Sequence, residues 1–395
     1  MRRTTDTPTD VELKPQRIAE SPTPATPVRV MHVVYELRFG GMELGVAKLV
    51  NAFDRRRITS SICSCRPATS AKARLASDVR LHELNRRDGN DPMIVGRLAA
   101  LFRRERPHVV HTHAWGTLCE GVLAARLARV PIIVHGEHGT MSTHPRNLLV
   151  QRWVWSRVDQ VLSVSSRLAE RMAREVSFPL ERIRTIRNGV DLTRFQRANR
   201  AAARASLGLD DAAFVVGTVG RLVPVKNQAL LVEALTLLAA RSVCMTALVA
   251  GEGPLREDLQ QRVNAAGLAS RVRLLGERSD VEQVMAALDV FTLTSTSEGM
   301  SNTIQEAMAV GVPVVATHVG GADELVEDGL TGVLVPSENA TALADALEGL
   351  FRDPARRARF GDAGRERAER EFTLARMVRE YEDLYLRLAA KKLVS

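Results

Sequence analysis

The sequence has few aromatic residues, few cysteines and no long apolar run. Tryptophan, tyrosine and phenylalanine make up 4% of the 395 residues, which leaves few rings to stack on the bases of a single-stranded nucleic acid. The four cysteines are scattered, so neither a paired zinc motif nor a disulfide framework is expected, and a reducing compartment is the default. No stretch approaches the roughly 18 uninterrupted apolar residues that a membrane-spanning helix needs.

Two glycine-rich phosphate motifs are also missing. Gly-x-Gly-x-x-Gly follows no predicted strand and no Walker A sequence occurs, which excludes the usual dinucleotide fingerprint and the usual P-loop. The first 27 residues contain five prolines and lack the apolar stretch of a secretion signal. We therefore expect residues 1–27 to be a disordered leader outside the fold.

Charge is distributed unevenly along the chain. Residues 28–200 carry 30 Lys and Arg against 15 Asp and Glu, whereas residues 201–395 carry 21 against 27. A basic first half is typical of proteins that bind nucleic acid, anionic lipid headgroups or phosphorylated substrates. It is equally consistent with arginines that simply decorate solvated helix faces.

From Val28 onward, short apolar runs alternate with longer amphipathic stretches, as in strands followed by helices. Strands are expected at 28–35, 60–65, 109–111, 132–135, 161–164 and 183–186, and then at 214–220, 246–251, 272–275, 290–294, 314–317 and 332–335. This order predicts an α/β protein with two Rossmann-like, doubly wound parallel sheets, in domains spanning 28–200 and 201–371. Residues 372–395 are expected to form a helix that packs back across the junction, and ligands are expected between the domains.

The strongest functional signal is the segment from Glu298 to Glu306. A helix is expected to begin near Ser301 or Asn302, because both are good capping residues and good helix formers follow. The N–H groups of Met300, Ser301 and Asn302 would then face an anion at the positive end of that helix. The two carboxylates would accept hydrogen bonds from hydroxyls on either side of it, which fits a nucleotide sugar. The alternative is an ordinary turn followed by a solvated helix.

This segment resembles the Glu-x7-Glu signature of glycosyltransferase family 4, whose members are retaining enzymes of GT-B architecture with two facing Rossmann-like domains. The resemblance runs through several motifs in the family's order, from about Val28 to Leu388. It implies that the second domain binds most of the donor, with Glu298 near the donor sugar and Glu306 on the ribose hydroxyls. Gly299 and the three residues after it would line the donor as well.

A second matching segment runs from Gly220 to Asn227. Arg221 and Lys226 could converge on a diphosphate, whose negative charge grows as the bond to the sugar breaks, and two fixed cations can replace a metal in that role. No Asp-x-Asp pair occurs in the chain, although metal-dependent glycosyltransferases of the other fold are expected to carry one. We therefore expect neither a metal nor another cofactor, and by resemblance both cations bind the donor diphosphate.

Smaller matches occur in loops that are expected to follow strands. Gly40 and Gly41 let backbone approach a ligand closely, and the family places its corresponding glycine loop against the donor phosphate. Gly251 and Arg278 resemble residues of donor-domain loops near the nucleotide, and the segment 188–191 resembles the one that ends the first domain. Each of these could equally be a simple loop, and only their order in the chain gives them weight.

Six of the nine histidines cluster between residues 108 and 144. By resemblance, His135 lies where family members place a histidine that contacts the donor sugar, so it is the expected catalytic residue of the first domain, alongside Glu298, Arg221 and Lys226 in the second. A zinc site is not expected, because the His-x-x-His pair lies on a glycine-containing turn and not on a helix. The remaining candidates are either acceptor-side or structural: His111, His113, Glu137 and His138.

Together these patterns predict a cytoplasmic, metal-independent, retaining glycosyltransferase that takes a nucleoside diphosphate sugar, with UDP-sugars favoured over GDP-sugars. The acceptor would be a hydroxyl of a glycan or of a lipid-linked intermediate. The spacing of the motifs resembles that of bacterial exopolysaccharide enzymes, including those associated with exosortase systems. The basic first domain adds the hypothesis of peripheral association with an anionic inner membrane.

Two other classes of function stay open at this point. A sugar-nucleotide epimerase or a phosphorylase could use the same scaffold; the first would consume donor without acceptor, and the second would require phosphate or pyridoxal. A non-enzymatic nucleic-acid or anion-binding protein could use the basic half. Nucleic acid is nevertheless not the expected partner, because the arginines are dispersed and aromatic residues are few.

Overall fold

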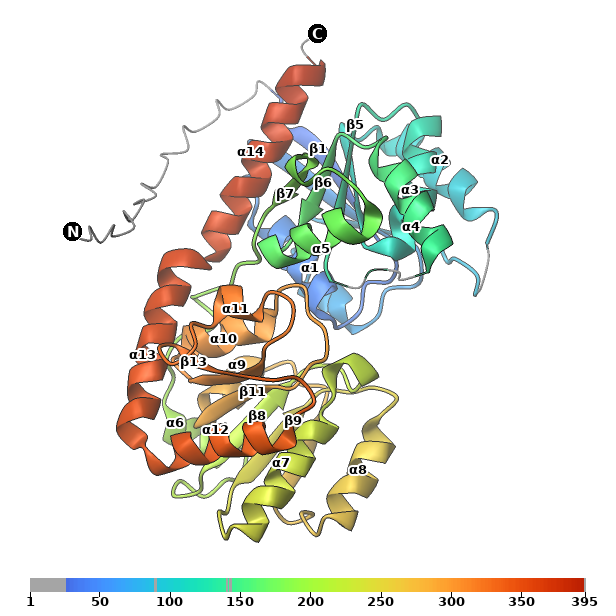
Figure 1. Ribbon diagram of the computed structural model, residues 1–395. Helices are drawn as coiled ribbons and strands as arrows, with labels where there is room; N and C mark the ends of the chain where they lie inside the picture. The colour runs from blue at the N-terminus through green and yellow to red at the C-terminus, as the bar shows by residue number, and fades with distance from the viewer. Residues whose placement is uncertain (1–25, 89–90, 140, 142–143, 394–395) are drawn as a thin grey trace, which may run out of the picture.

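Two parallel β-sheets organise the protein, one in each half of the chain (Figure 1). The computed structural model describes residues 26–88, 91–139, 141 and 144–393. Within these residues, the first sheet has seven strands in the order β3-β2-β1-β4-β5-β6-β7, and the second has six in the order β10-β9-β8-β11-β12-β13. Neighbouring strands pair in parallel throughout. The expectation of two doubly wound, Rossmann-like sheets is thus confirmed.

The first sheet is covered by helices, so its central strands are buried. Its strands are β1 (Val28–Val34), β2 (Ile58–Ser64), β3 (Arg80–Glu83), β4 (Val109–His113), β5 (Ile132–Glu137), β6 (Gln160–Ser163) and β7 (Ile183–Thr185). Its helices are α1 (Gly41–Ala52), α2 (Ile94–Glu105), α3 (Trp115–Leu127), α4 (Pro145–Trp155) and α5 (Ser166–Val176), with 3-10 turns at Ser70–Arg74 and Leu180–Arg182. Every residue of β4 and β5 is buried, as expected for strands inside a parallel sheet.

The second sheet repeats this plan. Its strands are β8 (Val215–Val219), β9 (Thr246–Ala250), β10 (Val272–Gly276), β11 (Val290–Leu293), β12 (Val314–Thr317) and β13 (Gly332–Val335). The helices are α6 (Arg200–Ser206), α7 (Ala229–Ala240), α8 (Arg256–Ala265), α9 (Val281–Ala286), α10 (Asn302–Val310), α11 (Ala322–Leu325), α12 (Ala340–Arg352) and α13 (Pro354–Glu371), with a 3-10 turn at Pro224–Lys226. Helix α6 is fixed to this domain by the buried Arg204, which pairs with Asp289 at 2.7 Å.

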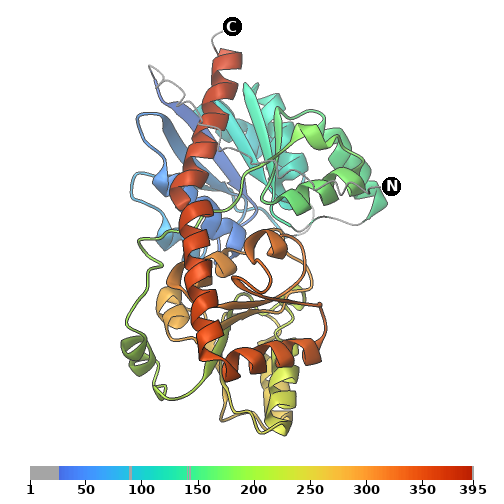
Figure 2. The ribbon, with the colours of Figure 1, turned by 60° about the vertical axis from the view of Figure 1, so that its left-hand side comes forward.

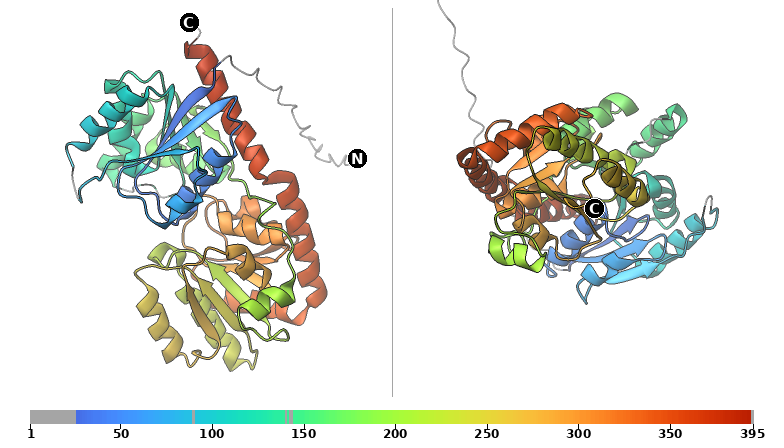
Figure 3. Two further views of the ribbon diagram at one scale, coloured as in Figure 1. Left: turned by 180° about the vertical axis from the view of Figure 1, so that it is seen from behind. Right: turned by 90° about the horizontal axis from the view of Figure 1, so that it is seen from below.

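The last helix returns to the first domain (Figure 2). Helix α13 packs on α10, whereas α14 (Leu374–Leu393) packs along β1 and β5, and Figure 3 shows it from behind beside the blue strands. The short segment between α13 and α14 is bound to the first domain through Val190. The backbone N–H of Val190 donates to the carbonyl of Phe372 at 2.7 Å, and its carbonyl accepts from the N–H of Leu374 at 2.9 Å. Met377 and Tyr381 are buried in the first-domain core, as their helical spacing predicts.

Strand β3 and helix α13 are among the elements that were not predicted. Strand β3 has only four residues, none of them fully buried, at the edge of the sheet, so it lacks the apolar run that marks the other strands. Helix α13 is rich in arginine and glutamate, so its sequence shows no clear apolar stripe. Most of the expected leader lies outside the described residues. Among the described helices, none is both long enough and apolar enough to cross a membrane.

Candidate functional site

The carboxyl ends of strands from both sheets meet where the domains touch. The side-chain amide of Asn302, at the start of α10, donates to the carbonyl of Gly41 at 2.8 Å. Lys48 of α1 donates to the side-chain oxygen of Asn302 at 3.3 Å. The loop after β5 and the loop after β11 pass so closely that a Cβ on Gly139 would lie 2.5 Å from the nitrogen of Gly299. Only glycine permits this approach, and it also suits the positive φ of Gly139, +117°.

The amino terminus of α10 lies in this contact. Ser301 is its N-cap, and its hydroxyl accepts a hydrogen bond from the N–H of Ile304 at 3.4 Å, which confirms the helix start expected from the sequence. Asn188, which follows β7, donates to the carbonyl of Met300 at 3.2 Å. The first domain thus holds the loop before α10, and the first N–H groups of the helix lie next to the domain contact, where an anion is favoured.

An ion pair stands beside that helix terminus. Lys226 ends the 3-10 turn after β8, and its ammonium lies 2.5 Å from an oxygen of Glu298. The hydroxyl of Ser295 donates to the same oxygen at 2.6 Å. Arg221, from the same loop as Lys226, is exposed and forms no ion pair with a described residue. The loop therefore offers one free cation and one whose carboxylate partner also lies at the site.

Three further candidate residues lie in loops around the site. A Cβ on Gly251 would lie 1.9 Å from the carbonyl oxygen of Gly220, and its φ is +146°. Gly251 therefore allows the loop after β9 to pack on the loop that carries Arg221. Arg278, after β10, pairs with Asp280 at 2.6 Å. Gly40, before α1, is packed against the carboxylate of Glu43.

Glu306 lies one turn into α10 and is partly buried. Loss of hydration raises the pKa of its carboxyl group to about 7, and Glu282 adds to the rise, whereas Lys48 and Arg194 lower it. Burial in turn lowers the pKa of Lys48. The sequence interpretation did not include Lys48 or Arg194. Lys48 lies on α1, only seven residues after Gly41, and that proximity to the glycine pair was the available signal.

Buried imidazoles form a hydrogen-bonded chain on the first-domain side. His138 Nε2 lies 3.0 Å from His113 Nδ1, and His113 Nε2 lies 3.0 Å from His32 Nδ1. Burial lowers the pKa of His138 to about 4 and that of His32 to about 3, and it holds the pKa of His113 well below the usual value. The chain is therefore neutral at physiological pH, and His113 must donate to one neighbour and accept from the other. His32, on β1, was missed because its partners lie about 80 residues away.

His111 lies behind this chain. Its Nδ1 is 2.7 Å from the hydroxyl of Tyr385 on α14, and its side chain is fully buried. Among the described residues, His32, His111 and His113 could offer a metal three nitrogens within 4.8 Å of one another. Both nitrogens of His113 are already bound to imidazoles, whereas His32 Nε2 and His111 Nε2 are buried without a hydrogen-bond partner among the described residues.

His135 and Glu137 form a second buried group. His135 Nε2 lies 3.0 Å from a carboxylate oxygen of Glu137, and Gln151 of α4 donates to the same oxygen at 2.9 Å. The other nitrogen of His135 lies 2.9 Å from the hydroxyl of Thr112. Both ring nitrogens of His135 thus have protein partners, and neither His135 nor Glu137 is exposed. His138, which is partly exposed and follows them, is the imidazole whose backbone touches Gly299.

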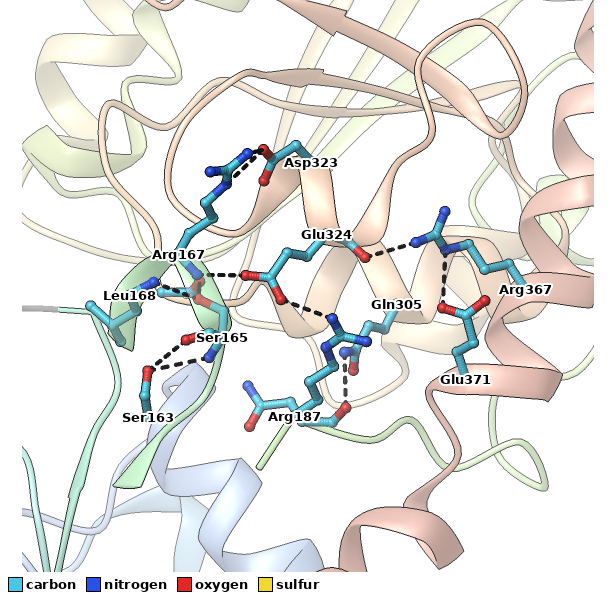
Figure 4. A network of polar contacts seen from close by, with 12 residues as sticks. Ser163, Ser165, Arg167, Leu168, Arg187, Gln305, Asp323, Glu324, Arg367 and Glu371 are labelled. Atoms are coloured by element: carbon cyan, nitrogen blue, oxygen red, sulfur yellow. Dashed lines mark hydrogen bonds and ion pairs between the residues drawn. The ribbon is translucent and has the colours of Figure 1, made fainter. Parts of the chain in front are cut away.

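A polar network clamps the domains next to the site (Figure 4). The carboxylate of Glu324, on α11, accepts from the backbone N–H of Arg167 at 2.7 Å and pairs with Arg187 at 3.1 Å. Arg167 also pairs with Asp323 at 3.0 Å. In the same view, Ser165 lies at the start of α5. Its hydroxyl donates to the carbonyl of Gly299 at 2.9 Å. These contacts join residues more than 130 positions apart in the sequence, so no local sequence pattern could predict them.

Comparisons with known proteins agree with this arrangement. Residues 39–194 match the family described as Glycosyltransferase Family 4, and residues 199–367 match the one described as Glycosyl transferases group 1. The UDP-Gal:alpha-D-GlcNAc-diphosphoundecaprenol alpha-1,3-galactosyltransferase of Escherichia coli is 30% identical over 75% of this chain and 79% of its own length. The D-inositol 3-phosphate glycosyltransferase of Mycolicibacterium gilvum is 32% identical over 64% of this chain and 62% of its own.

The fold is also similar to that of a solved structure. Anabaena Alr3699/HepE, in complex with UDP and glucose, superposes with a TM-score of 0.80 over 90% of this chain and 99% of its own, at 24% identity. That identity supports the two-domain GT-B architecture alone. Taken with the sequence matches across both halves, it leads to one conclusion: the chain belongs to glycosyltransferase family 4 and is a nucleotide-sugar glycosyltransferase with the GT-B fold.

Proposed function

We propose that this protein transfers a sugar, with retention and without a metal, from a UDP-sugar to a hydroxyl of a glycan or lipid-linked acceptor in polysaccharide assembly. The observation that carries the proposal is the Lys226–Glu298 pair next to the amino terminus of α10. The similar proteins support the donor class, since one uses UDP-Gal and another was solved with UDP and glucose. The first of these acts on a diphosphoundecaprenol-linked acceptor, which supports the acceptor class.

The second domain would hold the leaving diphosphate. Lys226 has three N–H donors, so it can keep Glu298 and still reach a phosphate oxygen. Arg221 and the first N–H groups of α10 would supply the other donors, and fixed charges of this kind stabilise a developing anion strongly because they need not reorganise. Glu298 would then lie beside the donor sugar, and Glu306 would accept hydrogen bonds from the ribose hydroxyls.

The first domain would supply the acceptor side. Its histidine chain ends at His138, next to Gly299, and a neutral imidazole can accept a hydrogen bond from an attacking hydroxyl. His135, bound at both nitrogens, would act by holding Glu137 and the turn before His138. In this scheme the departing phosphate receives the acceptor proton, so no side chain needs to be a strong base.

The place of the reaction is part of the proposal. An acceptor built on a lipid diphosphate would bring the enzyme to the cytoplasmic face of the inner membrane, as a peripheral protein. Exopolysaccharide assembly, including the exosortase-associated kind, is the setting that the motif spacing favours. The excess of basic residues in 28–200 supports contact with anionic headgroups.

Thermal stabilisation of the purified protein by nucleotides tests the donor assignment. The panel is UDP, GDP and ADP with their common sugar conjugates, in EDTA, with Glu306→Ala alongside. A ligand present at one hundred times its Kd adds about 2.7 kcal/mol to the free energy of unfolding. We expect a shift with uridine nucleotides that is lost in the variant. A shift with guanosine nucleotides alone would correct the donor, a shift that requires added metal would contradict metal independence, and no shift at all would contradict the proposal.

An acceptor assay then separates transfer from the alternatives on the same scaffold. Donor consumption that needs an added lipid-diphosphate sugar, with the new bond in the configuration of the donor, is the expected result. Consumption without any acceptor would indicate an epimerase or a hydrolase. Consumption that requires inorganic phosphate would indicate a phosphorylase.

A further inference from the structure

Large apolar side chains are exposed together on helices α3 and α4 of the first domain. They form what we call the α3–α4 face: Leu123, Leu127, Leu149, Val150 and Trp153. Leu149 is 69% exposed and Trp153 is 58% exposed. The three residues of α4 follow the spacing of one helical stripe, and α3 packs beside α4 (Figure 1). Isolated exposed leucines are ordinary in proteins, but five large apolar side chains exposed on two neighbouring helices indicate an interaction surface.

The opposite side of α4 is already used by the protein core. Val154 and Trp155 are buried there, and Gln151 holds the buried Glu137. Helix α4 therefore carries large apolar side chains on its exposed side as well as on its buried side, whereas a surface helix normally turns a polar side to water. The exposed stripe is not needed for packing within the chain, so its apolar character points to a partner outside it.

The exposed charged side chains of α3 and α4 are all basic. Exposed arginines border it: Arg103, Arg126, Arg146, Arg152 and Arg157. Helix α4 contains no acidic residue, and the single acid of α3, Glu120, pairs with Arg86 at 3.2 Å. Arg103 donates to the carbonyl of Leu127 at 2.8 Å, which places it at the edge of the face. Its partner should therefore be both apolar and anionic.

The arrangement of Trp153 narrows the choice further. The guanidinium of Arg157 lies 3.7 Å from the centroid of its indole ring. A tryptophan stacked with arginine joins an apolar body to a cationic end, and tryptophan and arginine concentrate at the boundary between lipid chains and headgroups. A second copy of this chain would bring five arginines against five arginines, so self-association is disfavoured by charge.

We propose that the α3–α4 face docks on an anionic lipid bilayer, with the leucines and Trp153 among the upper acyl chains and the arginines among the headgroups. The biological role of this docking rests on the proposed function, in which the acceptor is linked to a lipid. Helix α4 follows the loop that contains His138 and holds Glu137 from its inner side. Docking through its outer side would place the acceptor half of the site close to the membrane surface.

Vesicle flotation of the full chain, without nucleotide or acceptor, measures the docking directly. The vesicles are phosphatidylglycerol with phosphatidylcholine in equal parts, or phosphatidylcholine alone. We expect binding to the anionic vesicles that weakens with salt. We expect Leu149→Ser with Trp153→Ser to reduce the partition constant by about tenfold or more, given the apolar surface of these two side chains. Arg146→Glu with Arg152→Glu should abolish the preference for anionic lipid.

Controls keep the result interpretable. Leu180→Ser and Leu330→Ser remove leucines that are exposed elsewhere, at 46% and 49%, and both should bind vesicles like the unmodified protein. Equal binding by all variants, or no binding to either vesicle, would overturn the proposal. Concentration-dependent dimerisation that the α4 double variant abolishes would assign the face to a second copy instead.

The same variants separate docking from the enzyme's function. Nucleotide-induced stabilisation and transfer to a water-soluble acceptor should be unchanged in the α4 double variant, because its side chains lie outside the donor site. Loss of vesicle binding with intact transfer supports both proposals. Failure of transfer in the unmodified protein, with vesicle binding intact, would count against the proposed reaction alone.

Discussion

The two domains bring opposite chemistry to their contact. The first contributes neutral imidazoles that are buried and bound to one another, from His32 through His113 to His138. The second contributes charges that neutralise each other, Lys226 and Glu298. Imidazoles that already have partners hold a fixed shape, whereas an ion pair near a helix terminus can admit a third charged group. The first half of the site is therefore suited to position a hydroxyl, and the second to receive a diphosphate.

The largest effect is expected from acid, which should destabilise the first domain because its buried histidines are neutral. His32, His111, His113 and His138 have pKa values below that of an unfolded histidine, so the unfolded state binds more protons below about pH 6.5. Stability should fall as pH falls below 6.5, by about 1.4 kcal/mol per pH unit for each such histidine. All three tryptophans lie in the first domain, so denaturation followed by tryptophan fluorescence at pH 7, 6 and 5 reports on this half.

Two variants control the acid experiment. His32→Gln removes one buried imidazole and should make the pH slope shallower by about one proton. His318→Gln removes a histidine that is mostly exposed and should leave the slope unchanged. A stability that stays flat from pH 7 to pH 5 would contradict the buried neutral chain.

The next largest effect is expected from a substitution that moves the two domains apart at the site and changes no charged residue. A Cβ on Gly299 would lie 2.4 Å from the carbonyl oxygen of His138, so Gly299→Ala should push the domains apart. Because a displacement of reacting groups by about 1 Å can cost a factor of about 100 in rate, kcat/KM should fall by about 100-fold or more. Gly349→Ala is the matched control, since its Cβ would meet only the end of an arginine at 3.9 Å. Steady-state kinetics with retained thermal stability would show the effect, and unaltered kinetics in Gly299→Ala would refute the contact.

A smaller effect is expected when one positive charge is removed from the second domain's part of the site. Lys226→Ala should reduce kcat about 100-fold, a loss typical of one fixed donor to a developing anion, while the protein remains folded because Lys226 is only partly buried. Lys226→Arg should recover part of this loss. Lys72→Ala, which removes a lysine that is 61% exposed, should behave as the unmodified enzyme. A KM effect with normal kcat would show that Lys226 binds the donor without assisting its departure.

The smallest effect concerns the carboxyl group of Glu306, which titrates near neutrality. Glu306 has a pKa of about 7, so it is increasingly protonated as pH falls below 7. A protonated carboxyl accepts fewer hydrogen bonds, so donor affinity should weaken by at most about tenfold per pH unit below 7. Calorimetric titration at pH 6, 7 and 8 measures this, and Glu306→Gln should remove the dependence. A pH dependence that persists in the variant would assign the titration to another group.

Much of this organisation could be predicted from local sequence. Alternating apolar runs predicted twelve of the strands, and Ser301 predicted the start of α10. The order of motifs predicted the family. These succeeded because strand and helix periodicity, capping and glycine turns are properties of short segments. Strand β3 was not predicted, because an exposed four-residue edge strand has no such periodicity.

The partners within the site could not be predicted in the same way. The sequence named His113 and His138 as candidates, but it did not indicate that His32 completes their chain. It named Lys226 and Glu298 as candidates, but it did not indicate that these two residues, 72 positions apart, bind each other. It marked α14 as amphipathic, but not that Tyr385 would reach His111.

The sequence by itself therefore determined most of the elements, their order, the family and the chemical types present at the site. The tertiary structure alone decided which nitrogen meets which oxygen, which carboxylates are deprived of water, and which apolar side chains are left exposed on α3 and α4. The physical reason is one of range. Hydrophobic periodicity acts over a few residues, whereas hydration, pKa and charge pairing depend on all atoms within several ångströms, whatever their distance along the chain.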